Sequence, residues 1–217
     1  MSPMQIWPTI ALMALAYLIG SVPFSYLIAR ANGVDLRKVG SGNVGGANVW
    51  RSCGFGPFIL AASCDIIKGM LPTLAALHLS EWAPLIGMRL DPLPPGAVIL
   101  VGIAAILGHT FSVFLYFKGG KAVATSSGVL LAIFPLLIPI GLVAWVAAFL
   151  ITRMSSVGSL TAAAAEMIAG TVLYITGRLP LAYVVFIWVM VAFIIFLHRA
   201  NIQRLLAGTE SRFSRLL

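Results

Sequence analysis

The chain has 217 residues, of which 60% are apolar and only 9% are charged, and its formal net charge is +8. A soluble globular domain is about half apolar and about a quarter charged, so this chain cannot cover its surface with polar groups in water, and an ordinary soluble protein is excluded. Its basic residues lie between apolar runs, which favours anionic lipid or a small anionic substrate as a partner and argues against nucleic acid. The length predicts a single domain over residues 1–217.

Six apolar runs follow one another along the chain, and each is a candidate membrane helix. They cover residues 6–28, 57–77, 97–117, 129–150, 160–175 and 181–197. The first run lacks the basic start and the small-residue cleavage site of a signal peptide, so we expect it to be retained as a span, interrupted at Gly20-Ser21-Val22-Pro23. The predicted fold is all-α, a polytopic bundle of transmembrane helices.

Three connecting segments predict which way this bundle faces. Residues 30–56, 118–121 and 198–217 hold ten of the fourteen Lys and Arg residues, whereas the proline-rich segment 78–96 has no basic excess. The positive-inside rule places the three basic segments in the cytoplasm. The first of them and the C-terminal tail share that side only if the number of spans is odd, seven when short helices are included, with the N-terminus outside and the C-terminus in the cytoplasm.

Six apolar runs disagree with the odd number of spans that the charge distribution predicts. Two regions of the sequence could explain the difference. Pro135 and Pro139 could divide residues 123–150 into two shorter helices. Alternatively, the alanine-rich run 160–175, which contains Glu166, does not cross the membrane fully. The sequence leaves both alternatives open, and it leaves the role of Glu166 open as well.

The first basic segment has four glycines within seven residues, at positions 40, 42, 45 and 46. Glycine adopts a positive φ without steric cost, so such a segment can aim successive backbone N–H groups at one anion. Ser41, Asn43 and Asn48 add neutral donors. Arg51 offers a guanidinium fork that matches phosphate oxygens. A flexible interhelical loop would explain the glycines alone, but the donors beside them favour anion binding.

The second basic segment is a turn, Lys118-Gly119-Gly120-Lys121, that leads into the next predicted helix. His109 precedes this turn and Thr125 follows it. The backbone amides, the helix N-terminus and the Lys121 ammonium would together attract a phosphate. The pattern is not GxxxxGK[ST], so ATP is not predicted. A cationic membrane anchor explains the two lysines equally well.

The third basic segment begins after the last apolar run. His198 and Asn201 are three residues apart and would share one face of a helix, which Arg204 continues and Gly208 ends. A basic amphipathic anchor on anionic lipid explains the arginines of this segment, but it explains Asn201 and Glu210 less well.

In their order and spacing, the three segments resemble the three motifs of the bacterial acyl-phosphate:glycerol-3-phosphate acyltransferases, the PlsY family. The resemblance covers nearly the whole chain, from Gly20-Ser21-Val22-Pro23-Phe24 to Glu210, and it includes Asp65-Ile66-Ile67-Lys68-Gly69. The chain departs from the family pattern at Gly46-Ala47, where Ala-Thr is usual, and at Ala122, where Gly is frequent.

The resemblance implies transfer of a fatty acyl group from acyl phosphate to the 1-hydroxyl of glycerol 3-phosphate, at the cytoplasmic face of a bacterial inner membrane. Expected partners are these two substrates and membrane lipid. No cofactor is expected, and the scattered acids and histidines show no metal-ligand spacing. The catalytic residues predicted from motif and resemblance are Ser41, Arg51, Lys121, His198 and Asn201. The predicted substrate-binding residues are Gly40, Gly42, Asn43, Asn48, His109, Gly119, Gly120, Thr125 and Glu210.

Several mechanistic alternatives stay open. The sequence has neither an HxxxxD nor a GxSxG pattern, so no covalent acyl-enzyme is expected. His198 or a substrate phosphate oxygen could take the hydroxyl proton, and we favour the phosphate. Asp65 and Lys68, three residues apart, are expected to form a structural ion pair rather than to act in catalysis. A transporter of an anionic phosphate ester and a non-catalytic membrane scaffold are the competing functions.

Overall fold

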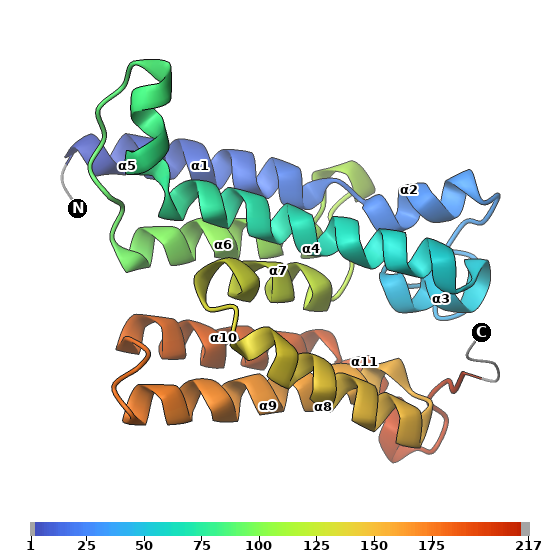
Figure 1. Ribbon diagram of the computed structural model, residues 1–217. Coiled ribbons are helices and arrows are strands. Elements are labelled where there is room, and N and C mark those ends of the chain that lie inside the picture. Colours follow the sequence, from blue (N-terminus) through green and yellow to red (C-terminus); the bar gives the residue numbers. More distant parts are fainter. Residues whose placement is uncertain (1–2, 214–217) are drawn as a thin grey trace. The chain divides into compact units, whose positions relative to one another are not determined.

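The computed structural model describes residues 3–213, and in that range all regular elements are helical (Figure 1). The prediction of an all-α chain is therefore confirmed; Arg215 of the expected basic tail lies outside the described residues. The α-helices are α1 (Pro3–Ser21), α2 (Phe24–Ala31), α3 (Gly46–Cys53), α4 (Phe55–Leu77), α5 (Leu79–Trp82), α6 (Pro95–Thr110), α7 (Val123–Ile133), α8 (Leu137–Thr152), α9 (Ser155–Ile175), α10 (Leu181–Leu197) and α11 (Arg199–Leu206). Two 3₁₀ turns, η1 (Ala83–Ile86) and η2 (Val113–Leu115), complete the set.

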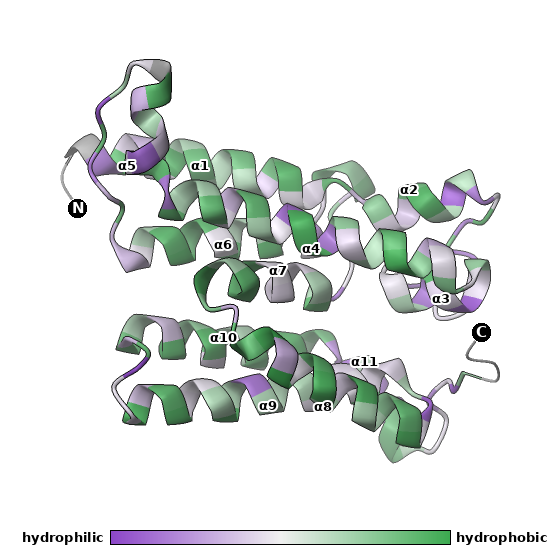
Figure 2. Ribbon diagram, in the orientation of Figure 1, coloured by the Kyte–Doolittle hydropathy of each residue, from purple (hydrophilic) through white to green (hydrophobic). Residues whose placement is uncertain are grey.

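Long apolar helices dominate the chain, as the hydropathy colouring in Figure 2 shows. Four segments within the described residues are long and apolar enough to cross a membrane, namely Gln5–Ala31, Phe55–Leu77, Pro95–Leu115 and Ser155–Ile175. The pair α10 and α11, bent by 59°, would make a fifth, and α7 and α8 are shorter apolar helices. The odd number of spans and the sides of the two termini stay predictions.

Two of the helix breaks fall at prolines. The first apolar run divides between α1 and α2 at Val22-Pro23, as expected. Residues 134–136, which include Pro135, separate α7 from α8. Residues 123–150 therefore form two shorter helices, as the first of the two alternatives required. Pro139 lies in the first turn of α8, where its missing N–H would have no helical partner in any case.

One expected boundary was wrong. The helix α9 starts at Ser155, five residues before the expected run, because the polar start Ser155-Ser156-Val157-Gly158-Ser159 hides a continuous 21-residue helix. The connecting segment 30–56 also contains a helix, α3, that the sequence did not predict. That helix is short and amphipathic, so hydropathy alone does not reveal it.

Backbone packing divides the helices into two compact units, which we describe separately. Of the described residues, unit 1 contains 3–24 and 62–133, and unit 2 contains 25–61 and 134–213; α4 runs through both. The expectation of one domain over residues 1–217 stays a prediction.

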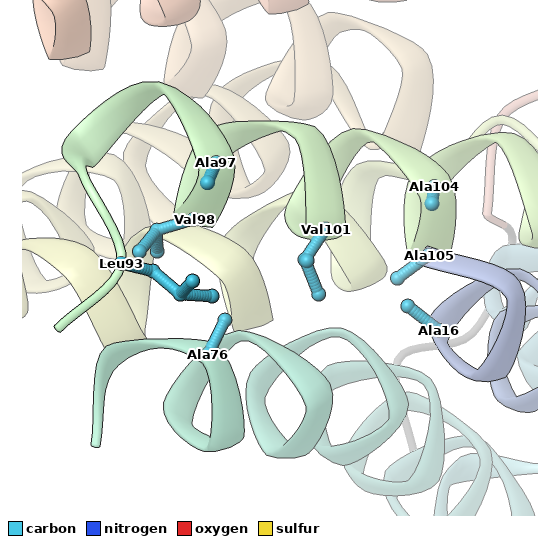
Figure 3. Packing of buried hydrophobic residues seen from close by; sticks show 8 residues of the cluster. All are labelled: Ala16, Ala76, Leu93, Ala97, Val98, Val101, Ala104 and Ala105. Atoms are coloured by element: carbon cyan, nitrogen blue, oxygen red, sulfur yellow. The ribbon is translucent and has the colours of Figure 1, made fainter. Parts of the chain in front are cut away.

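Unit 1 is built on the packing of α1 along α6. Small and branched side chains from α1, α4, α6 and the segment that precedes α6 form its core, drawn in Figure 3: Ala16, Ala76, Leu93, Ala97, Val98, Val101, Ala104 and Ala105. Small residues allow membrane helices to approach closely. A Cβ added at Gly20 would collide with the Ala105 carbonyl, and one at Gly108 would collide with the Tyr17 carbonyl, so these backbones are in direct contact.

Unit 2 is built on α9, which packs against α8 and α10. Glu166 of α9 is buried, and its Oε1 lies where a Cβ of Gly141 in α8 would be, so its side chain fills space between these two helices. Near the other end of α8, the rings of Trp50, Phe149 and Phe213 meet at centroid distances of 4.9–5.2 Å. This aromatic cluster joins α3, α8 and the C-terminal tail.

Candidate active site

A single buried amide holds the first glycine-rich segment. The Asn48 side chain, from α3, is 1% exposed. Its Nδ2 donates to the carbonyl oxygens of Leu36, Val39 and Asn43 at 3.0–3.1 Å, and its Oδ1 accepts from the Ser41 N–H at 3.2 Å. A side-chain amide has two N–H groups, so the three carbonyl contacts engage both of them, with one N–H shared between two carbonyls. Asn48 therefore shapes the segment from within.

The backbone of this segment has the predicted glycine conformations at two positions. Gly40 and Gly42 have φ of +56° and +69°, in the region that favours glycine. A Cβ at Gly40 would also collide with Asn48 Oδ1. Several amides expected to face an anion are used internally, because Gly45 N–H donates to Asn43 Oδ1 at 2.9 Å and Gly42 N–H to the Val39 carbonyl at 3.0 Å. The Ser41 side chain is exposed, and its Oγ accepts from the Asn43 N–H at 3.4 Å.

Glu210 is the centre of the third predicted motif. Its carboxylate is 7% exposed and accepts three hydrogen bonds, from Ser156 Oγ at 2.6 Å, Asn201 Nδ2 at 2.6 Å and Arg204 Nε at 2.7 Å. Burial alone would raise the pKa of Glu210, but the three hydrogen bonds and the charge of Arg204 together outweigh burial. The pKa therefore lies below its ordinary value, and the group is a carboxylate at neutral pH. The network ties the start of α9 and helix α11 to the C-terminal tail.

Arg51 lies on α3, in the same unit, with its guanidinium carbon 4.4 Å above the Phe213 ring. Its Nε is buried and makes no hydrogen bond within the described residues. Burial lowers the pKa of Arg51, Glu210 raises it and Arg204 lowers it, with a net lowering. A guanidinium stays charged despite such a shift. The aromatic face thus supports a cation whose Nε has no protein acceptor.

His198 is the N-cap residue of α11 and is 3% exposed. Its Nδ1 lies 2.8 Å from the Ile194 carbonyl, which identifies Nδ1 as the donor of this bond. Asn201, one turn further, reaches Glu210 as described. The predicted pairing of His198 and Asn201 on one helical face is consistent with these positions.

The second glycine-rich segment, in unit 1, folds back on the end of α6. Gly119 N–H donates to the Thr110 carbonyl at 2.9 Å, and Gly120 N–H donates to the His109 carbonyl at 3.1 Å. These two amides are therefore engaged by backbone carbonyls and do not both point at an anion; the substrate-binding role of Gly119 and Gly120 stays a prediction. A Cβ at Gly119 would collide with the His109 carbonyl, and one at Gly120 with His109 Nε2. At Gly119 the obstacle is backbone, so only glycine fits there, whereas at Gly120 it is the buried His109 ring.

Lys121 is half-buried and follows this turn, just before α7 begins at Val123. Ala122 adopts a φ of +57°, which accounts physically for the frequent glycine at this position in the family pattern. Thr125 is fully buried in the first turn of α7, and its hydroxyl makes no hydrogen bond within the described residues. The first helical hydrogen bond of α7 is Ser126 N–H to the Ala122 carbonyl at 2.7 Å, so the amides of residues 123–125 precede that ladder.

The predicted site residues therefore fall into two groups. Unit 2 contains the first and third motifs, and its contacts connect Ser41 with Asn48, and Asn201 with Glu210. Unit 1 contains His109, Gly119, Gly120, Lys121 and Thr125. Ser156 and Phe213 were missed, although each contacts a predicted residue. Ser156 lies 54 residues from Glu210 in the chain, and no local pattern links the two. No cluster of His, Cys, Asp and Glu suited to a metal occurs between residues 3 and 213.

These features define a class: an all-helical membrane protein with two glycine-rich, cationic segments, each fixed by buried polar groups. A family model described as glycerol-3-phosphate acyltransferase matches residues 10–208. The chain belongs to this family.

Individual relatives agree with that assignment. The glycerol-3-phosphate acyltransferase of Roseiflexus sp. (strain RS-1) is 57% identical over 96% of this chain and 97% of its own length. That of a Thermus thermophilus strain is 44% identical over 92% of each chain. The fold resembles crystal structures of PlsY (YgiH), an integral membrane glycerol 3-phosphate acyltransferase. Its glycerol 3-phosphate form gives a TM-score of 0.83 with 37% identity, over 95% of this chain and 96% of that one. Its lysophosphatidic acid form gives a TM-score of 0.81 with 36% identity and the same coverage.

Proposed function

We propose that this chain transfers a fatty acyl group from acyl phosphate to the 1-hydroxyl of glycerol 3-phosphate, and that it releases 1-acylglycerol 3-phosphate and inorganic phosphate. The observation that supports this most directly is the likeness to PlsY in a glycerol 3-phosphate form and in a lysophosphatidic acid form, over 95% of this chain. Those names state an acceptor and an acylated product for that enzyme. The acyl-phosphate donor is what the resemblance to the PlsY family implies, and the chemistry of the residues in this chain is compatible with it.

Acyl phosphate suits the groups that the chain offers. It is a mixed anhydride with a good leaving group, so its reaction needs charge stabilisation and positioning more than it needs a protein nucleophile. The predicted residues are cations and neutral donors, and the sequence contains no GxSxG elbow. Two substrates with phosphate groups require two anion sites, and each unit holds one candidate.

The proposed roles follow from the contacts. In unit 2, Arg51 binds a phosphate through the guanidinium fork that packs on the Phe213 ring, and the exposed Ser41 hydroxyl donates a hydrogen bond to it. Asn48 and Glu210 position those groups and do not touch substrate, because their polar atoms are engaged by the protein. In unit 1, Lys121 and the first turn of α7 bind the phosphate of glycerol 3-phosphate.

The reaction balances without a covalent intermediate. The 1-hydroxyl oxygen attacks the acyl carbonyl carbon and forms the new ester bond. The bond from that carbon to the phosphate oxygen breaks, and the phosphate leaves with the electron pair. We favour a phosphate oxygen as the acceptor of the hydroxyl proton, as the family resemblance suggests. His198 is the alternative base, because its Nδ1–H donates to the Ile194 carbonyl and the ring's lone pair is then on Nε2. If His198→Ala abolishes turnover while substrate binding and folding stay intact, His198 is the base instead.

The decisive experiment measures phosphate release by the purified, lipid-reconstituted protein. Release should require acyl phosphate and glycerol 3-phosphate together, and mass spectrometry should find 1-acylglycerol 3-phosphate in equal amount. Ser41→Ala and Arg51→Lys should each slow release by at least about tenfold, since charge-assisted hydrogen bonds are at stake. No release from folded protein would contradict the proposal. Flux of a phosphate ester into sealed liposomes, without product, would support a transporter.

We also place the site at the cytoplasmic face of a bacterial inner membrane, on the strength of the basic residues in segments 30–56, 118–121 and 198–217. A cysteine substituted for Ser41 should react with an impermeant maleimide in inverted membrane vesicles and be protected in right-side-out ones. The reverse pattern would contradict this orientation.

A further inference from the structure

An ion pair lies deep inside α4. Asp65 and Lys68 are each 2% exposed, and Lys68 Nζ is 2.8 Å from Asp65 Oδ1. Two charges inside a candidate membrane span are costly to bury, and a buried ion pair gives a protein little net stability. The ion pair expected from the sequence is therefore present, but net stability alone does not explain why two charges are kept at this position.

The contacts of this pair lead to two other segments of unit 1. Lys68 Nζ donates to the Val22 carbonyl at 2.9 Å, at the break between α1 and α2. On the other side, Asp65 Oδ1 is 3.7 Å from His109 Nδ1, at the end of α6. The pair thus lies between a helix break and an imidazole that are 87 residues apart in the chain.

The far side of that imidazole supports the glycine turn. His109 Nε2 lies where a Cβ of Gly120 would be, so the ring packs against the turn backbone. The main chain at the same place is tied by Gly120 N–H to the His109 carbonyl and by Gly119 N–H to the Thr110 carbonyl. A rotation of the ring would therefore displace the backbone immediately before Lys121.

We infer that Asp65 and Lys68 are positioning residues for glycerol 3-phosphate binding, which act through His109 on the Gly119–Lys121 turn. The carboxylate faces the Nδ1 side of the imidazole at 3.7 Å and acts on it electrostatically, and Lys68 anchors the carboxylate to the α1–α2 break. This fixes the ring edge against which the turn rests, and so fixes the position of Lys121. The inference rests on the proposed function for its kinetic consequence, but the effect on the turn itself can be measured without any substrate.

The first measurement is hydrogen exchange of the peptide that covers Gly119 and Gly120, in reconstituted protein. Asp65→Asn removes the negative charge that faces His109. The double variant Asp65→Asn/Lys68→Met removes both charges, so it leaves no unpaired ion and is expected to fold. Both should speed exchange in this peptide by about tenfold, because local opening becomes easier. The matched control is Thr73→Val, also fully buried on α4, which removes only a hydrogen bond to the Gly69 carbonyl and should leave this exchange unchanged.

The second measurement separates the two substrates kinetically. In both charge variants the KM for glycerol 3-phosphate should rise about tenfold, while the KM for acyl phosphate and kcat change less than about threefold. A merely structural role predicts a loss of folded protein, with unchanged KM values for what is left. Exchange and KM values equal to those of Thr73→Val would overturn the inference. Absence of any phosphate release by the unaltered protein would overturn the proposed function instead, and the exchange measurement would still decide the positioning role.

Discussion

The backbones of the two glycine-rich segments are held in position by different kinds of contact. The segment around Ser41 is held by the neutral amide of Asn48, which collects carbonyls from residues no more than 12 positions away. The turn before Lys121 is held by an imidazole and an ion pair drawn from three separate helical regions. The first support is local and uncharged, and the second is long-range and charged.

This difference predicts how mutations should affect each segment. A local amide network breaks together with its own loop, so damage there should stay confined to the residues around Ser41. A long-range network couples the turn to the packing of α1, α4 and α6, so damage there should be felt in unit 1 more widely. The changes below test that contrast, in order of decreasing expected effect.

Gly119→Ala should be the most harmful of these changes. Its Cβ would collide with the His109 carbonyl, which is backbone and cannot move aside as a side chain can. We expect phosphate release to fall by at least about a hundredfold, since small displacements of a binding turn cost that much. The control is Gly96→Ala on α6, where an added Cβ meets open space, and its rate should stay within about twofold. Near-normal release by Gly119→Ala would mean that the turn is not held as described.

Asn48→Ala should cause the second-largest loss of phosphate release. It leaves three carbonyls and the Ser41 N–H without their partner, which costs about 2–4 kcal/mol locally. Release should fall by about thirtyfold, and hydrogen exchange should rise in residues 36–43. Exchange at Gly119 should not change, which distinguishes this local failure from the one above. Asn32→Ala, which removes an exposed amide bonded to the Ile28 carbonyl, is the matched control and should resemble the unaltered protein in both measurements.

Glu210 makes the third motif sensitive to acid. Its pKa is lowered in the folded chain, so its contribution to stability is complete above the ordinary value of 4.5 and is lost as the pH falls through the folded pKa. Proteolysis of the tail, measured from pH 7 down to pH 3, should accelerate at the acid end in the unaltered protein. Glu210→Gln should be cleaved faster at pH 7 and show little further change. Glu81→Gln, in an exposed helical turn, should keep the original pH profile. A flat profile in the unaltered protein would argue against an ionised Glu210.

Phe213→Leu should have a moderate effect through Arg51. Loss of the aromatic face under a partly buried guanidinium costs about 1 kcal/mol, or about fivefold in kcat/KM. Phe149→Leu makes the same change in the same cluster, where the ring partners are Trp50, Trp145 and Phe213. It should lower kcat/KM by less than about twofold at equal folded protein. Equal losses in the two variants would assign the effect to packing alone.

Ala122→Gly should give the smallest change, and it should be an improvement. The residue adopts a φ of +57°, which costs an L-residue about 1 kcal/mol, and glycine relieves this at some cost in chain entropy. We expect a stability gain of at most about 1 kcal/mol in thermal unfolding. Ala124→Gly, two residues later and inside α7, should lose about as much. A loss in both variants would show that the strain at position 122 is compensated by other contacts.

Much of the fold follows from the sequence because membrane helices consist of long apolar runs and are broken by prolines. The breaks at Pro23 and Pro135 were predictable on that basis. The helix α3 and the start of α9 were not, since both are rich in glycine, serine and polar residues that resemble loops. A hydropathy scale detects helices whose side chains are apolar enough to face lipid, and it does not detect polar helices that pack against other parts of the protein.

The site was predictable as a set of motifs but not as a set of contacts. Spacing placed Asn48 and Ser41 in one segment, yet it could not tell that the Asn48 amide is engaged by backbone carbonyls. It predicted free amides at Gly119 and Gly120, where the chain folds back on α6. It also gave no sign of Ser156 or Phe213, because their partners come from distant helices. Hydrogen bonds are settled by tertiary packing, which local patterns do not encode.

The glycine contacts of unit 1 have a consequence for mutational tolerance. Cβ atoms added at Gly20, Gly69, Gly108 and Gly128 would each meet a backbone carbonyl of a neighbouring helix. No rotamer change can relieve such an overlap, so a saturation mutagenesis screen should find that even alanine is not tolerated at these four positions. Lipid-facing positions on the same helices, such as Leu15 and Leu71, should accept most apolar replacements. The evolutionary freedom of this chain would then lie mainly on the surface that touches the bilayer.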